Sequence, residues 1–173
     1  GWIGKNWACH QLSQEATGDF LLFIDADTIL SEEVVLSAVT NSTNMNTDLL
    51  TVMPQRITNC IVEKLLFPFI DWASFCWIPM KRAHNSQNSH LSASFGQFML
   101  FKREAYEEIG GHAAIRHIPI DDFKLGRTTK KSGLKWTLFI GANCVQVLPS
   151  KGNIDAFMSV SRSVFPAIYY KFS

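Results

Sequence analysis

The sequence lacks any run of roughly 18 uninterrupted apolar residues, so none of its segments predicts a transmembrane helix. It also lacks a signal peptide, and because it starts at Gly1 rather than Met we expect a piece of a longer protein. It lacks an excess of either charge: 16 basic and 15 acidic residues give a net charge of +1, which does not favour a nucleic-acid partner.

Closely spaced cysteines are missing as well. The four cysteines form neither a metal-binding pair nor a disulfide framework, so we expect reduced thiols in a cytosolic compartment. What the sequence does contain is 47% hydrophobic residues over 173 positions, with many Phe and Trp. This composition predicts one globular domain with a sizeable core.

The most informative segment is Asp25-Ala26-Asp27, which directly follows the apolar run 20–24. Such a run predicts a strand buried on both faces, as in parallel sheets, and ligands bind at the carboxyl ends of such strands. Two carboxylates one residue apart repel each other unless a cation lies between them, and Mg²⁺ or Mn²⁺ held with substrate phosphates fits. The alternative is a strand that ends in a polar turn. A phosphatase of the haloacid-dehalogenase type is excluded, because its motif continues with Gly and Thr, whereas Thr28 and Ile29 follow here.

Periodicity predicts the remaining elements. We expect helices over residues 5–17, 32–41 (with Ser31 as N-cap), 60–78, 106–109, 121–132 and 154–172, and strands over 20–24, 49–53 and 98–101. A hairpin is expected from 136–140 and 144–148, and a mobile loop over 81–92. The helix–strand alternation in the first third argues for a parallel α/β sheet.

A second acidic pair, Asp121-Asp122, lies at the predicted start of the helix over 121–132. The helix dipole favours their ionised forms, while the adjacent like charge disfavours them. An ionised carboxylate at the edge of a site can accept a proton from an attacking hydroxyl. Acidic residues are also common at helix starts without any function, so both interpretations remain open.

Several segments, taken together, resemble a family 2 glycosyltransferase of the GT-A fold, an α/β fold with a Rossmann-like mixed sheet. The matching segments, in order, are residues 1–8, 16–19, 22–27, 96–101, 110–112, 121–122, 125–127 and 131–133. Within that family the sequence is similar to membrane-associated enzymes that glycosylate carotenoid acids or hopanoid-type lipids.

The resemblance implies roles for the acidic residues. Asp25 and Asp27 match the motif that binds the metal, Mg²⁺ or Mn²⁺, and the donor nucleotide, with Asp27 the more direct ligand. Asp122 matches the catalytic base, and Asp121 stands before it where the family usually has Glu. The expected reaction is an inverting transfer from a nucleotide-diphosphate sugar to a lipid-like acceptor.

The resemblance also implies partners for less diagnostic residues. Gly96, Gln97 and Phe98 match the segment that faces the acceptor, and Lys5 falls near the nucleotide unless it is simply an exposed helix residue. His112 either contacts the acceptor, the metal or the leaving diphosphate, or is structural beside its Gly-Gly turn; the same choice holds for His117.

Arg162 lies where processive relatives carry a Gln-x-x-Arg-Trp motif, but here the Gln and Trp positions are Ser159 and Ser163. This departure favours the transfer of a single sugar, with Arg162 either at the diphosphate or on the surface. Family members also begin with two strands that hold the base and ribose, and neither is present before Gly1, so we expect an N-terminally truncated domain.

We therefore expect residues 1–150 to form the catalytic and acceptor part, and residues 151–173 a helix that leads toward a membrane segment. The aromatic face of residues 60–80 either lies in a membrane interface or packs against the sheet, as in an ordinary globular domain. The expected location is the cytoplasmic face of the cell membrane. The rival function is a degenerate relative that binds partners without catalysis.

Overall fold

A computed structural model describes residues 1–77 and 79–161, apart from the side chains of residues 73–75 and 77. The helices are α1 (Gly4–Glu15), α2 (Val34–Met45), α3 (Ile61–Trp77), α4 (Met80–Asn85), α5 (Arg103–Glu108), α6 (Gly111–Ala114) and α7 (Asp121–Lys131), and residues 153–161 are also helical. The strands are β1 (Phe20–Phe23), β2 (Thr28–Leu30), β3 (Leu49–Met53), β4 (Gln55–Arg56), β5 (Met99–Lys102), β6 (Trp136–Ile140) and β7 (Val145–Val147).

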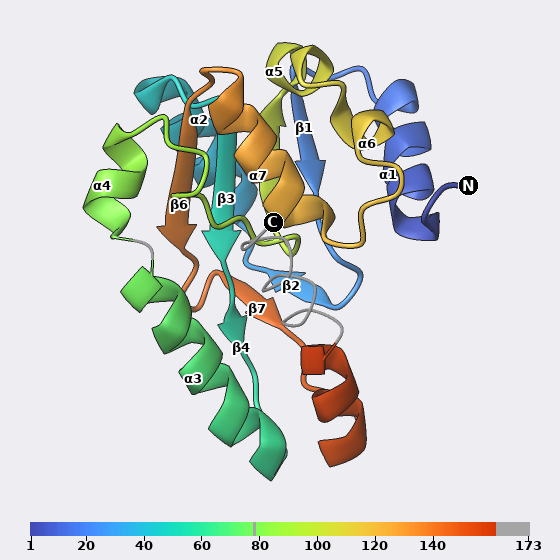
Figure 1. Ribbon diagram of the computed structural model, residues 1–173, viewed down its shortest axis with the longest axis vertical. Helices are drawn as coiled ribbons and strands as arrows, with labels where there is room; N and C mark the ends of the chain where they lie inside the picture. Colours follow the sequence, from blue (N-terminus) through green and yellow to red (C-terminus); the bar gives the residue numbers. More distant parts are fainter. Residues whose placement is uncertain (78, 162–173) are drawn as a thin grey trace.

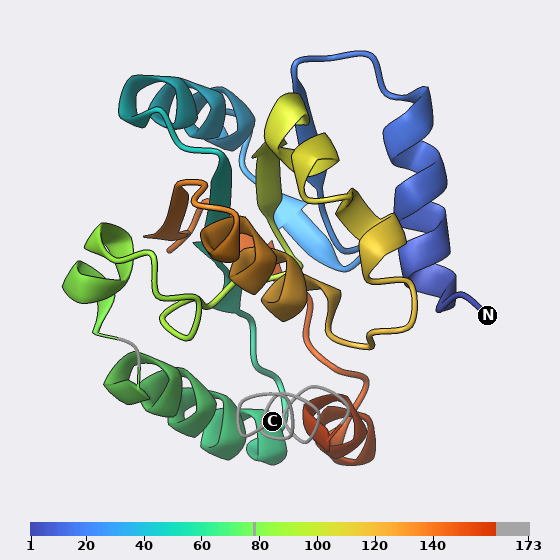
Figure 2. The ribbon, with the colours of Figure 1, turned by 45° about the horizontal axis from the view of Figure 1, so that its top comes forward.

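A four-stranded mixed sheet forms the centre of the molecule, with α7 on one face and α2 on the other (Figures 1 and 2). Its order is β1-β5-β3-β6; β5 is antiparallel to both neighbours, and β3 and β6 are parallel. The predicted mixed α/β fold is therefore present. The simple parallel pairing expected for the first third is wrong, because β5 inserts between β1 and β3.

Strand β3 divides the core into two halves because successive side chains of a strand point to opposite faces. Leu49 and Met53 pack with Leu125 of α7, whereas Leu50 and Val52 pack with residues of α2. All five residues of β3 are buried, as the apolar run over 49–53 predicts. The carboxyl ends of the strands are thereby held between two helical layers.

Strand β1 differs from its prediction. Only Leu21 is fully buried, and the other three residues of the strand are partly exposed. Among the described residues β1 is one of the two edge strands of the sheet and pairs with β5 alone, and its residues line a cavity that it shares with α1. The apolar run correctly predicts the strand but not the burial of both faces.

The predicted hairpin over 136–148 is also wrong. Strand β6 stays in the central sheet, whereas β7 joins a second sheet of order β2-β7-β4. The chain leaves the first sheet at Gly141, whose N–H donates to the Met53 carbonyl at 2.8 Å. A side chain at Gly141 would approach Val52 and Val145 within 3 Å, so the crossing needs glycine. The short strands β2 and β4 escaped prediction because two or three residues carry no clear period.

The remaining differences lie at element ends. Helix α2 begins at Val34 and ends at Met45, and its start carries no side-chain cap, so Ser31 is not the N-cap. Residues 81–85 of the expected loop are helical, in α4. Buried Lys130 of α7 holds this region by donating to the carbonyls of Ala83, Ser86 and Leu91 at 2.5, 3.1 and 2.7 Å.

Candidate active site

Asp25 and Asp27 lie in the turn that follows β1. The Thr28 N–H donates to the Asp25 carbonyl at 3.1 Å, and the Leu148 N–H donates to the Asp27 carbonyl at 3.0 Å, so strand pairing on both sides fixes the turn. The Asp25 side chain is partly buried, whereas Asp27 is exposed. The two carboxylates are thus presented differently: Asp25 faces the protein and Asp27 remains accessible to a ligand.

Lys5 of α1 links the two acidic pairs. Its Nζ lies 2.9 Å from Asp25 Oδ1 and 3.2 Å from Asp121 Oδ2. Burial lowers the pKa of Lys5, but the charges of Asp121 and Asp25 outweigh it, and the net shift is upward. Lys5 therefore stays protonated and neutralises part of the negative charge that gathers here. Lys5 thus makes two ion pairs, which the alternative of a simply exposed helix residue did not predict.

Asp122 stands at the start of α7, and two backbone N–H groups hold its side chain in place. Its Oδ2 accepts the Gly96 N–H at 3.0 Å, and its Oδ1 accepts the Phe123 N–H at 2.7 Å. Burial, and then repulsion by Asp121, raise the pKa of Asp122 to about 6 against these hydrogen bonds. A carboxylate with this pKa is ionised at neutral pH yet basic enough to accept a proton, which suits a general base.

Gly96 marks the point where these segments converge. A Cβ at this position would lie 3.2 Å from Lys5 Nζ, 3.4 Å from Asp25 Oδ2 and 3.5 Å from Asp122 Oδ2. Segments far apart in the sequence thus meet within one side-chain diameter. Beside them, a cavity of about 240 Å³ between α1 and β1 is lined by Lys5, Asp25 and Asp121 and by apolar residues of both elements.

The other predicted acceptor residues are placed differently with respect to this cavity. Phe98 is fully buried among the side chains between the sheet and α2 and does not line the cavity, and that its segment faces the acceptor stays a prediction. His112 lines the cavity, is 1% exposed and contacts Tyr106 and Asp121. Gln97 is partly exposed next to Gly96. Arg162 lies outside the described residues.

Sequence reasoning missed Tyr106, whose hydroxyl lies 2.8 Å from His112 Nδ1. The available signal was the Gly110-Gly111 turn between them: both glycines adopt positive φ, which folds α6 back onto α5. Such a turn brings residues on either side of it together, but their side-chain contact depends on the packing of both against β1.

The protein side chains alone do not form a complete metal site in the described part of the chain. Across residues 1–77 and 79–161, no group of three or more His, Cys, Asp or Glu side chains converges as a cation site. Mg²⁺ in particular usually takes only one or two carboxylates from the protein and completes its shell with water and substrate phosphates. The donor set of Asp25 and Asp27 therefore fits a cation that arrives together with a diphosphate.

Comparison with known proteins identifies relatives over most of the chain. It is 28% identical over 152 residues to the 4,4'-diaponeurosporenoate glycosyltransferase of Staphylococcus haemolyticus (strain JCSC1435), which covers 83% of this chain and 38% of the relative. It resembles the mannosyltransferase PcManGT from Pyrobaculum calidifontis, solved in complex with GDP-Man and Mn²⁺, with a TM-score of 0.58 and 16% identity. That match covers 97% of this chain and 48% of the other, and confirms the predicted GT-A fold.

The chain therefore spans less than half the length of both relatives. The sequence profile of a family described as "Glycosyltransferase like family 2" matches residues 1–162, which is nearly the whole chain. The chain belongs to glycosyltransferase-like family 2.

Proposed function

We propose that this chain carries the catalytic and acceptor side of an inverting, metal-dependent transfer of one sugar from a nucleotide-diphosphate sugar to a lipid-like acceptor. One observation carries the proposal: a carboxylate with a pKa near 6, Asp122, stands beside Asp25 and Lys5 around Gly96. A general base and a charged diphosphate-binding turn must lie this close if one displacement is to involve both.

In the proposed reaction Asp122 accepts the proton of an acceptor hydroxyl or carboxylic acid. The freed oxygen forms a bond to the anomeric carbon while the bond from that carbon to the diphosphate breaks, and the diphosphate leaves with the electron pair. Lys5 offsets negative charge near the leaving group. Asp25 and Asp27 would hold the divalent cation, Mg²⁺ or Mn²⁺, which when bound supplies Lewis-acid stabilisation of the diphosphate.

The names of the relatives support the substrate classes. The curated relative is named for a carotenoid acid, 4,4'-diaponeurosporenoate, and the structural neighbour was solved with a nucleotide sugar and Mn²⁺. The acceptor class proposed for this chain is accordingly lipid-like, and the donor class is a nucleotide sugar.

A calorimetric titration of the whole protein with a panel of nucleotide sugars, with and without Mn²⁺, tests the function. We expect one donor to bind, and to bind only in the presence of the cation, because its diphosphate would complete the metal shell. If the folded protein binds no donor with or without Mn²⁺, the rival function, a relative that binds partners without catalysis, replaces this one.

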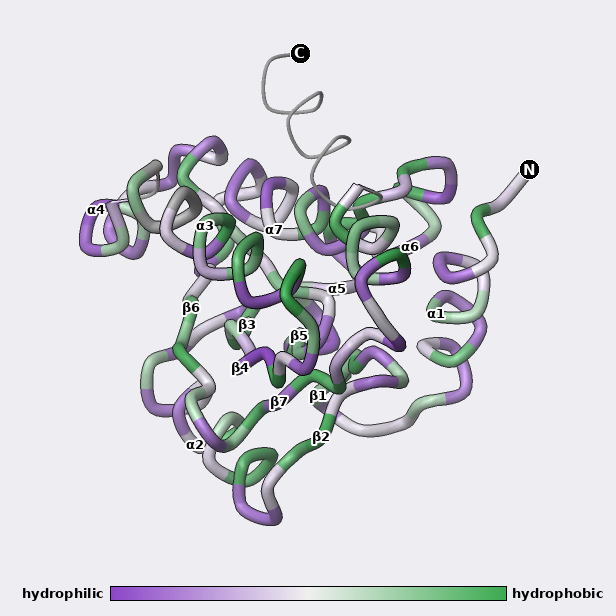
Figure 3. The backbone as a smooth tube through the Cα atoms, turned by 90° about the horizontal axis from the view of Figure 1, so that it is seen from below, coloured by the Kyte–Doolittle hydropathy of each residue, from purple (hydrophilic) through white to green (hydrophobic). Residues whose placement is uncertain are grey.

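An outward-facing apolar row on α3 supports the membrane part of the proposal. Ile61, Leu65, Phe69 and Trp72 recur at helical spacing and are each more than 60% exposed. These four side chains do not pack against the sheet, whereas Leu66 and Phe67 of the same helix are partly buried. Figure 3 shows both hydrophobic and hydrophilic residues along α3. The side chains of residues 73–75 and 77 lie outside the described set. Exposed aromatic and aliphatic rows of this kind suit a membrane interface.

The helix over residues 153–161 lies beside α3. Glu63, buried in the first turn of α3, accepts N–H groups of Asn59 at 3.0 Å and of Ser150 at 2.6 Å, and the Val62 N–H donates to Asn153 Oδ1 at 3.2 Å. These bonds hold the two helices side by side at the lower end of the molecule (Figures 1 and 2).

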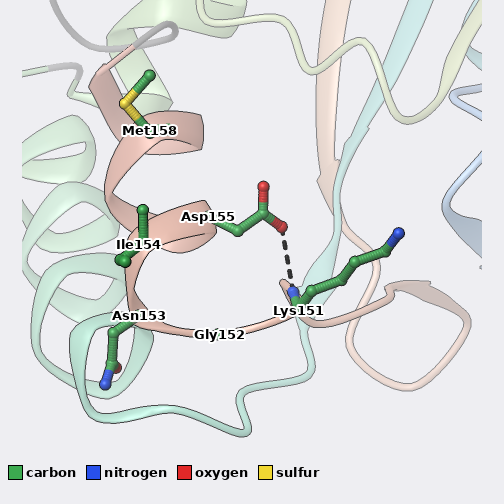
Figure 4. A pocket seen from close by; sticks show the side chains of 6 residues that line it. All are labelled: Lys151, Gly152, Asn153, Ile154, Asp155 and Met158. Atoms are coloured by element: carbon green, nitrogen blue, oxygen red, sulfur yellow. Dashed lines mark hydrogen bonds between the residues drawn. The ribbon is translucent and has the colours of Figure 1, made fainter.

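The apolar side chains of this second helix also point outward. Figure 4 shows Ile154 and Met158 on one side of it, while Asp155 accepts the Lys151 N–H at 3.1 Å. Ile154 is 83% exposed. Within the described part of the chain, no helix is both long and apolar enough to cross a bilayer. We therefore propose that the paired helices lie on the cytoplasmic face of the cell membrane.

Quenching of tryptophan fluorescence by brominated lipids tests this surface. In vesicles of mixed phosphatidylcholine and phosphatidylglycerol we expect Trp72→Phe to lose most of the quenching seen for the whole wild-type protein. The matched control is Trp7→Phe, which alters another exposed tryptophan, on α1, and should leave quenching unchanged. Equal quenching in wild type and Trp72→Phe would place the α3 row away from lipid.

A further inference from the structure

A buried polar pair stands behind the acidic site. The Tyr106 hydroxyl lies 2.8 Å from His112 Nδ1, and the His112 backbone N–H donates to the same hydroxyl oxygen at 3.1 Å. Phe23 of β1 packs on both rings, with centroid distances of 5.2 Å to Tyr106 and 4.8 Å to His112. Both side chains are almost fully buried, so their hydrogen bonds must be satisfied within the protein.

The backbone makes this pairing obligatory. Gly111 has φ +49°, and a Cβ on it would come within 2.4 to 2.8 Å of the Tyr106 ring and hydroxyl. Only glycine leaves the room that lets the tyrosine ring lie against the turn. The turn thereby fixes where the Tyr106 hydroxyl sits relative to the imidazole that follows one residue later.

The carboxylate opposite Nε2 decides where the histidine ring carries a proton. Burial raises the pKa of Tyr106, so the phenol keeps its proton. The hydroxyl oxygen accepts the His112 backbone N–H and also bonds the Ser13 side chain, so its bond with Nδ1 orients the imidazole without selecting the tautomer. Nε2, however, faces the carboxylate of Asp121, which can only accept, and therefore carries a proton.

Asp121 is the group that faces this proton. His112 Nε2 lies 3.7 Å from Asp121 Oδ2, longer than a hydrogen bond but a close contact between an N–H dipole and a carboxylate in a buried site. The same oxygen lies 3.2 Å from Lys5 Nζ. The contact with His112 and the charge of Lys5 outweigh burial and lower the pKa of Asp121.

We infer that Tyr106 and His112 are positioning residues that fix a proton on Nε2, and thereby hold ionised Asp121 against Lys5 and beside the base Asp122. This inference deepens the proposed function and rests on it for its catalytic consequence. The chain of contacts runs from Tyr106 through His112 and Asp121 to Lys5 and then Asp25, so it joins α5, α6 and α7 to the turn after β1.

Nitrogen-15 NMR of histidine side chains in the whole protein tests the arrangement directly. We expect His112, assigned by the signal lost in His112→Gln, to carry a proton on Nε2. In Tyr106→Phe, which keeps the ring and removes the hydroxyl that orients the imidazole, we expect a mixture of rings with and without that proton. A wild-type His112 whose Nε2 carries no proton, or an Nε2 proton that stays fixed in Tyr106→Phe, overturns the inference.

Transfer kinetics test the consequence for the site. His112→Leu keeps the volume but offers no N–H, so we expect kcat to fall by about tenfold, with donor KM unchanged, as for outer groups that orient a functional residue. His112→Gln can still donate and should recover most of the loss. The control is His117→Leu on the exposed neighbour, which should match wild type. If His112→Leu and His112→Gln lose kcat equally while having the same melting temperature, the result contradicts a positioning role for His112.

The two experiments separate this inference from the proposed function. The NMR measurement needs no substrate, so it decides the tautomer even if the panel of nucleotide sugars finds no donor. A fixed Nε2 tautomer without any transfer activity would overturn the proposed function and, with it, the catalytic half of the inference. Transfer activity with the wrong tautomer would overturn the inference alone.

Discussion

Replacing Asp122 by Asn is expected to reduce sugar transfer by about 10²- to 10⁴-fold, the range that a positioned general base contributes. The amide cannot take up the acceptor proton but has the size of the carboxylate. Because the Asp122 carboxylate accepts the backbone N–H groups of Gly96 and Phe123 and is not part of the proposed cation site, donor binding should stay close to that of wild type. Product formation followed by mass spectrometry, together with donor calorimetry, measures both quantities.

The pH dependence of wild-type transfer should carry the signature of the same residue. The pKa of Asp122 is raised to about 6, so the ionised, proton-accepting form predominates above pH 6 and is lost below it. We expect kcat/KM to fall by about tenfold for each pH unit below 6 in wild type, and this limb to be absent in Asp122→Asn. Transfer at the wild-type rate by Asp122→Asn would remove Asp122 as the base.

Asn at this position also leaves one backbone donor without an acceptor. The two carboxylate oxygens each accept one N–H, whereas an amide offers one oxygen and one N–H. A loss of about 1–3 kcal/mol in unfolding free energy is therefore expected, the cost of one unsatisfied buried donor. Thermal melting of the variant establishes that the lost activity belongs to a folded protein.

The second large effect is expected from Asp27→Ala. Asp27 is the exposed carboxylate of the turn after β1, and with Asp25 it forms the protein's share of the proposed cation site. Its removal should weaken Mn²⁺-dependent donor binding by about 100-fold or more, since even groups that only support a metal ligand contribute about 10–100-fold in affinity. Electron paramagnetic resonance of free Mn²⁺ and donor calorimetry provide two independent readings.

Asp19→Ala is the matched control for this variant, because Asp19 is an exposed carboxylate at the opposite end of β1. It should leave both readings unchanged. Asp25→Ala should be more damaging than Asp27→Ala to the arrangement of the site, since it also removes the ion pair with Lys5. Donor binding that does not depend on Asp27, or on added Mn²⁺, would argue that Lys5 alone balances the diphosphate charge.

Elements dominated by local patterns were predicted from the sequence. The apolar run over 49–53 is strand β3, and the acidic start and basic end of 121–132 mark α7, which ends one residue earlier. In such segments propensity, charge and period all agree, so tertiary contacts only confirm them. The acidic residues of the site were found for the same reason: each pair stands at the end of a strongly patterned element.

Strand pairing was not predictable in the same way. Whether 136–148 closes as a hairpin or divides between two sheets depends on Gly141, which lets the chain pass the end of β3. The insertion of β5 between β1 and β3 likewise joins residues about fifty to eighty positions apart. A single sequence carries no signal for such distant partners.

The sequence by itself determined the family of this protein and where its candidate groups stand: a carboxylate turn after a strand, an acidic helix start, and the motifs of its family. Only the tertiary structure decided how these groups meet, because Lys5, Asp25, Gly96 and Asp121 are brought together by packing and not by spacing. It also decided that the α3 row faces outward, since a helical period defines an apolar face but not what covers it.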